Sequence, residues 1–168
     1  MEVEKYSAYN TGSLVLSSTF LLLPCIYTIY NGMHFFTALM VLASAISANY
    51  WRRATYGWRR TLDLWFSKIL FTIFLSQQFM YIWIVPPTPI SFTMIIEDKL
   101  IFENLRYYSS IASFVSMVYF YYLSEKSYHN EYDHWRTYHF IFHLFVALEQ
   151  IIILDAVYSS GKSKEDAL

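Results

Sequence analysis

Long stretches of this chain contain no charged residue. The first two cover residues 13–30 and 35–51, within the range of about 17 to 25 residues that a helix needs to cross a bilayer core of roughly 30 Å. Charged residues make up only 15% of the chain and hydrophobic residues 56%, whereas roughly a quarter of a soluble domain is charged. The sequence therefore predicts an all-α, polytopic transmembrane helix bundle.

We expect about five spans, within a single integral membrane domain that covers residues 1–168. The spans are residues 13–30, 35–51, 64–85, 107–123 and 137–154. Pro24 lies inside the first span and is expected to kink it, because proline lacks a backbone N–H. Neighbouring helices can satisfy the carbonyl that this leaves free.

The region between the third and fourth spans is interrupted by charge. Glu97, Asp98 and Lys99 split its short apolar runs, and a charged residue at a helix centre costs about 2.5 to 3.5 kcal/mol on insertion. We therefore expect residues 88–104 to form a short re-entrant or surface segment and not a sixth span.

Basic residues predict the orientation. Four of the twelve lysines and arginines lie between the second and third spans: Arg52, Arg53, Arg59 and Arg60. Positively charged short loops favour the cytoplasmic side, so this loop is expected there. Five spans then place the N-terminus in the cytoplasm and the C-terminus outside.

Charge and cysteine content limit the partners. A net charge of −1 disfavours a broad basic surface for nucleic acid. The single cysteine, Cys25, leaves no internal disulfide and no cysteine-based metal cluster. The expected partners are the lipid bilayer and other membrane helices, and no nucleic acid is expected.

A pair of histidines marks the last span. His139 and His143 are four residues apart, so both imidazoles lie on one helix face and could reach one metal ion. Asp63, at the start of the third span, could be a third ligand or the base that activates a metal-bound water. Ser47, late in the second span, could donate a hydrogen bond to an oxyanion. This pattern predicts a zinc site, although the same residues have structural explanations.

Those explanations are simpler. Two histidines in an aromatic-rich helix can hydrogen-bond to their neighbours without a metal. Asp63 follows Arg59 by four residues, a spacing that suits an ion pair on a helix surface. Ser47 belongs to a run of small residues that permits close helix packing.

The order of these residues resembles the alkaline ceramidase-like superfamily, also called CREST, whose members are seven-span membrane proteins and in many cases zinc-dependent lipid amide hydrolases. The resemblance places Ser47, Asp63, His139 and His143 in the positions of the family's serine, aspartate and final histidine pair. In the family a third zinc-binding histidine follows the serine by four residues, but here that position is Trp51. Two spans are also missing. The resemblance thus implies a reduced, non-hydrolytic relative.

Three functions follow from these observations. The first is a multi-pass membrane protein of structural or interaction type without catalysis. The second is a ceramidase-like zinc-dependent hydrolase of a lipid amide or ester, with Asp63 and Ser47 as catalytic residues and His139 and His143 as metal ligands. The third is a small channel or transporter, with a polar path lined by Gln77, Gln78, Glu149 and Gln150.

Overall fold

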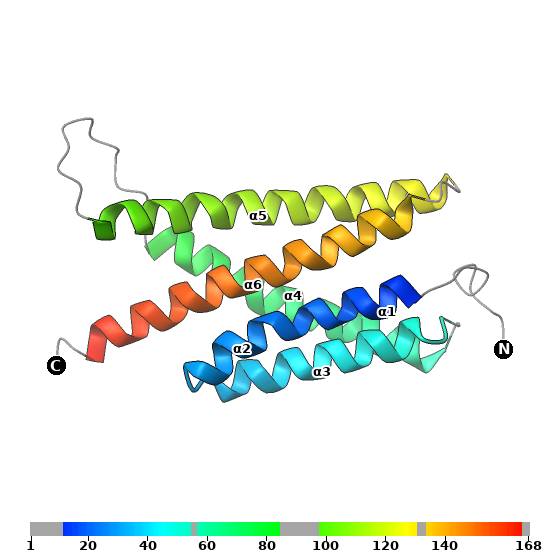
Figure 1. Ribbon diagram of the computed structural model, residues 1–168, viewed down its shortest axis with the longest axis horizontal. Helices are drawn as coiled ribbons and strands as arrows, with labels where there is room; N and C mark the ends of the chain where they lie inside the picture. The colour runs from blue at the N-terminus through cyan, green and yellow to red at the C-terminus, as the bar shows by residue number, and fades with distance from the viewer. Residues whose placement is uncertain (1–11, 55–56, 85–97, 131–133, 166–168) are drawn as a thin grey trace.

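The computed structural model describes residues 12–54, 57–84, 98–130 and 134–165, and these residues are folded almost entirely into helices (Figure 1). In chain order the elements are α1 (Gly12–Ser18), the 3₁₀-helix η2 (Thr19–Leu22), α2 (Leu23–Tyr30), α3 (His34–Trp51), α4 (Trp58–Ile84), α5 (Asp98–His129) and α6 (Trp135–Glu165). The described residues contain no strand, which confirms the all-α prediction for that part of the chain.

The elements α1, η2 and α2 follow one another without a break and form one rod. Pro24 lies in the first turn of α2, directly after the 3₁₀ segment. A proline at this position needs no intrahelical donor of its own. The predicted disturbance at Pro24 therefore takes the form of a tightened turn that ends one helix and begins the next.

A tight turn joins α2 to α3. The backbone N–H of Met33 donates to the carbonyl of Thr28 at 2.8 Å, and that of Gly32 donates to Ile29 at 3.2 Å. Gly32 has a φ of 68°. These two bonds and the left-handed glycine make a Schellman motif, which satisfies the last carbonyls of α2. The turn reverses the chain so that α3 lies beside the rod (Figure 1).

The remaining helices build the rest of the bundle. The long helices α5 and α6 pack against each other, while α4 contacts α3 and α6 (Figure 1). A large core cluster contains buried residues of α2, α3, α4 and α6, among them Met40, Phe74 and Ile153. A second cluster, which includes Trp51 and Trp135, lies where α1, α3 and α6 meet.

The helices differ in length from the predicted spans. Helix α5 begins at Asp98 and continues to His129, so residues 98–104 of the expected re-entrant segment belong to a regular helix. No glycine or proline interrupts residues 98–129, which explains why the helix extends beyond its apolar part. Residues 88–97 of that segment lie outside the described residues, as does the N-terminus. Helix α6 likewise extends to Glu165.

Within the described ranges, two helical stretches have the length and composition needed to cross a membrane. They are the rod Gly12–Tyr30, with a mean hydropathy of 1.7, and residues Trp135–Ser159 of α6, with a mean hydropathy of 2.0. These two coincide with the first and fifth predicted spans.

Candidate functional site

The histidine pair lies on one face of α6, as its spacing predicts. The ring centroids of His139 and His143 are 4.8 Å apart, and His143 is buried. Residues four apart in a helix are neighbours on its surface. The pair therefore presents two imidazoles to the same space within the bundle.

Each imidazole has a serine hydroxyl next to its Nδ1. Ser17 Oγ of α1 lies 3.0 Å from His143 Nδ1 and donates its own proton to the Leu14 carbonyl at 2.9 Å. Ser124 Oγ of α5 lies 3.4 Å from His139 Nδ1 and donates to the Trp135 carbonyl at 3.2 Å. A hydroxyl has one proton. We therefore assign the proton to Nδ1 of both histidines, which leaves a lone pair on each Nε2.

Trp51, at the end of α3, is packed against this pair. Its ring centroid lies 5.2 Å from that of His139, with the two rings at 69°, and it lies 6.4 Å from the ring of Trp135. The indole is buried and has no lone pair to offer a metal, because its nitrogen is a donor only. The position that faces the histidines from α3 is therefore filled by an aromatic ring.

Ser47, one turn before Trp51, belongs to a chain of polar contacts. Its hydroxyl accepts a hydrogen bond from that of Ser18 at 3.0 Å, and Ser47 lines the same cavities as Asp63 of α4. Ser18 and Ser47 are both buried. This contact connects α1 and α3 beside the histidine pair.

Two adjoining cavities contain these side chains. The larger, here called the histidine cavity, has a volume of about 550 Å³, and its polar lining includes Ser47, Asp63, His139 and His143. All four residues that the sequence singled out for chemistry are thus brought to one place. The smaller, here called the glutamate cavity, has a volume of about 120 Å³. It shares Ser47, Asp63 and His143 with the larger one, so the two adjoin.

Among the described residues, the histidine pair has no third metal ligand grouped with it. No three side chains of histidine, cysteine, aspartate or glutamate in that part of the chain are grouped closely enough to hold a metal ion. Protein zinc sites use three or four such ligands. The Nδ1–H assignment of both histidines would suit metal ligands, but Asp63 does not complete the set and Trp51 cannot. Two imidazoles without a third ligand are a half-site.

The glutamate cavity contains most of the polar path predicted from the sequence. Ser110 of α5 donates to Gln78 Oε1 at 2.7 Å and lies 3.3 Å from Glu149 Oε1. Gln78, Glu149 and Gln150 line the cavity, whereas Gln77 lines neither cavity. Gln78, Glu149 and Gln150 are buried, as is Ser110, which the sequence did not single out.

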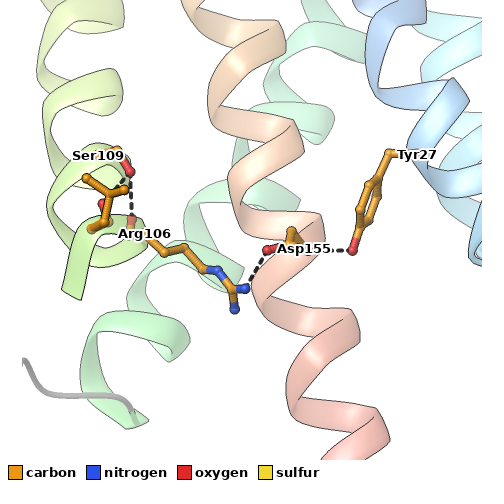
Figure 2. A network of polar contacts seen from close by, with 5 residues as sticks. Tyr27, Arg106, Ser109 and Asp155 are labelled. Atoms are coloured by element: carbon orange, nitrogen blue, oxygen red, sulfur yellow. Dashed lines mark hydrogen bonds and ion pairs between the residues drawn. The ribbon is translucent and has the colours of Figure 1, made fainter. Parts of the chain in front are cut away.

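A further polar network lies toward the opposite end of α6, and sequence reasoning missed it (Figure 2). Tyr27 donates to Asp155 Oδ1 at 2.7 Å, and Arg106 pairs with Asp155 Oδ2 at 2.7 Å. The network joins α2, α5 and α6. One signal was present in the sequence: Arg106 and Asp155 each lie directly beside the end of a predicted span.

Sequence reasoning also missed the serines that contact the histidine cluster. Ser17 and Ser18 are both fully buried, and they stand side by side within the first apolar stretch. A hydroxyl pair inside a predicted span was an available signal, because polar groups at that depth need partners.

Comparison with known proteins adds no assignment: no protein-family model, no curated protein and no solved structure matches the chain significantly.

Proposed function

We propose that the chain is a five-span membrane protein of structural or interaction type that does not hydrolyse lipids. Its outer surface supports the membrane location. Large apolar side chains are exposed on every helix, including Ile26 at 73%, Phe35 at 66% and Phe79 at 63%. Exposed apolar surface can mark a membrane contact when it is contiguous, and a bilayer would cover these side chains.

Two groups of polar contacts support five antiparallel spans: the Tyr27–Asp155–Arg106 network and the serine contacts of the histidine pair. Tyr27 lies near the end of the first predicted span, Arg106 at the start of the fourth and Asp155 at the end of the fifth, and the three side chains are in contact. Alternating spans would bring these three positions to the outer side. The contacts of His143 with Ser17 and of His139 with Ser124 join the other ends of the same three spans. These ends lie on the cytoplasmic side in this topology.

The main support for a protein that does not hydrolyse lipids is the packing of Trp51 on His139. It fills the position from which a third imidazole would reach the metal. The remaining polar groups contact one another: Ser17 with His143, Ser124 with His139, and Ser18 with Ser47. In this proposal they connect helices, and the chain is a reduced relative of the ceramidase-like superfamily.

The expected partner is a second membrane helix, which would pack on α5. Tyr108, Val115, Tyr119 and Tyr122 follow one another at intervals of seven, four and three residues and are each at least half exposed. Residues with this spacing form a stripe along one helix face. Such a stripe suits lipid chains or an aromatic helix–helix contact.

Metal content and lipid amidase activity test the proposal. The full chain is purified in detergent, and zinc is measured by elemental mass spectrometry in the wild type and in His139→Ala and His143→Ala. We expect no stoichiometric zinc in folded wild-type protein and no release of fatty acid from a lipid amide. About one equivalent of zinc that is lost in both variants would overturn it.

A lipid amide or ester hydrolase is the second candidate. One observation favours it: Ser47, Asp63, His139 and His143 line the same cavity. The described residues do not group three metal ligands. A zinc-dependent hydrolase would therefore need a further metal ligand in addition to His139 and His143. Fatty-acid release that Asp63→Asn abolishes would establish it in place of the first.

A further inference from the structure

The glutamate cavity contains two buried oxygen atoms that lack partners. Glu149 Oε2 and Gln150 Oε1 are inaccessible and accept no hydrogen bond within the described part of the chain. Their side chains are 5% and 3% exposed, and both line the cavity. Buried polar atoms are nearly always hydrogen-bonded, because an unpaired one costs about 1 to 3 kcal/mol. Both atoms are acceptors, so the missing partner must be a donor.

Neither neighbouring serine hydroxyl meets Glu149 Oε2 in hydrogen-bond geometry, and Ser113 donates to the Phe145 carbonyl at 3.5 Å. The hydroxyl of Ser110 already donates to Gln78 Oε1 at 2.7 Å and lies on the Oε1 side of Glu149, at 3.3 Å. No lysine or arginine is found among the described residues that line the glutamate cavity. Two carboxylates do line it, those of Glu149 and Asp63. The cavity is thus rich in acceptors and contains no cation of its own.

Aromatic rings make up much of the wall. The phenylalanines that line the cavity are Phe66, Phe71, Phe74, Phe114 and Phe142. The faces of aromatic rings carry partial negative charge and attract ammonium groups. A proton on Glu149 would satisfy one oxygen but would make no use of the ring faces that line the cavity. An organic cation would meet both the oxygens and the rings.

We propose that the glutamate cavity binds the head of a primary alkylammonium ion. Such a group has three N–H donors, enough for Glu149 Oε2 and Gln150 Oε1, while its charge is held by the Glu149 carboxylate and the phenylalanine rings. The alkyl chain extends into the histidine cavity of about 550 Å³, which adjoins the first along Phe71, Met117 and Phe142.

The test compares four probes on the full-length wild-type chain in detergent: octylammonium, octyltrimethylammonium, octanol and sodium ion. Binding is followed by isothermal titration and by the shift of the unfolding temperature, because a ligand that binds the folded state raises it. We expect saturable binding of octylammonium. Octanol lacks the charge and octyltrimethylammonium lacks the N–H donors, so each should bind at least about tenfold more weakly.

Other results would overturn the proposal. Equal effects of octylammonium and octanol would indicate partition into apolar surface. Equal binding of octylammonium and octyltrimethylammonium would show that the unpaired oxygens do not recognise the head group. Sodium that binds alone and displaces octylammonium would assign the oxygens to an inorganic ion.

A pair of variants locates the site. Glu149→Gln keeps the size of the side chain and removes its charge, so it should weaken octylammonium binding by at least about tenfold, because charge-assisted hydrogen bonds are roughly twice as strong as neutral ones. Gln77→Leu is the control, since Gln77 lines neither cavity, and it should leave octylammonium binding unchanged. Unchanged binding in folded Glu149→Gln would overturn the assignment. If that variant does not fold, Gln150→Leu removes the second acceptor. It should also weaken octylammonium binding, and unchanged binding would overturn the assignment.

This inference does not depend on the proposed function. Its probes require neither zinc nor hydrolysis, and its failure would leave the histidine cluster as described.

Discussion

The indole of Trp51 meets the imidazole of His139 edge to face, with ring centroids 5.2 Å apart and an angle of 69° between the rings. Trp51 comes from the end of α3 and His139 from the first turns of α6. The contact brings residue 51 to the place from which a metal ligand on α3 would have to approach the histidine pair. The missing third imidazole can therefore be tested by placing a histidine at residue 51.

Trp51→His should create a zinc site. A third imidazole facing His139 and His143 would complete the three protein ligands of an open zinc centre. We expect zinc to rise from no stoichiometric content to about one equivalent per chain, measured by elemental mass spectrometry on detergent-purified protein.

The control for this gain is Trp51→Phe, which keeps an aromatic ring without a ligand atom and should bind no zinc. The double variant Trp51→His/His139→Ala should lose what the single variant gained. A folded Trp51→His protein without zinc would show that residue 51 does not reach the metal position.

Ser17→Ala should destabilise the bundle. It removes the hydroxyl that accepts the Nδ1–H of buried His143, and an unsatisfied buried donor costs about 1 to 3 kcal/mol. The loss is measured by thermal unfolding followed by circular dichroism. Thr19→Ala is the matched control on the adjoining turn, because the hydroxyl of Thr19 is exposed and surface changes stay within about 0.5 kcal/mol. Equal effects of the two variants would contradict the role of Ser17.

Tyr27→Phe should also lower stability, through the network in Figure 2. The phenol donates to Asp155 at 2.7 Å, and hydrogen bonds to charged groups contribute about 1.5 to 3 kcal/mol. Asp155 is partly exposed, at 31%, so we expect about 1 kcal/mol because solvent screens the charge. Tyr30→Phe on the same helix serves as control, since Tyr30 is 89% exposed.

A double variant shows whether Tyr27 acts through Asp155. In Tyr27→Phe/Asp155→Asn the two losses should be less than additive, because the residues share one contact. Strict additivity, measured by the same unfolding experiment, would show that the hydrogen bond contributes nothing.

Five spans predict that the two termini lie on opposite sides of the membrane. Cys25 is the one cysteine of the chain, so Cys25→Ser gives a background in which Ser7→Cys and Ser163→Cys can be labelled separately. A membrane-impermeant maleimide should label Ser163→Cys in intact cells, and Ser7→Cys only after permeabilisation. Labelling of both in intact cells would indicate an even number of spans. The reverse pattern would keep five spans and invert the orientation.

Much of the architecture follows from local features of the sequence. The apolar stretches at residues 13–30 and 137–154 coincide with the two described helices that have span-like length and hydropathy, because apolar length is a property of each segment alone. The i, i+4 spacing of His139 and His143 places both rings on one face for the same reason. Helix ends were less predictable: α5 begins at Asp98, since charged residues end an apolar stretch without ending a helix.

The sequence by itself determined the helical class, the apolar segments and the shared face of the histidine pair, because these depend on composition and on the fixed period of the α-helix. The tertiary structure alone decided which polar groups meet. Ser17 and His143 are 126 residues apart in the chain and 3.0 Å apart in space, and Tyr27 reaches Asp155 across 128 residues. Such contacts depend on how helices cross and rotate against one another. That arrangement is set by the packing of many side chains at once, and no single segment encodes it.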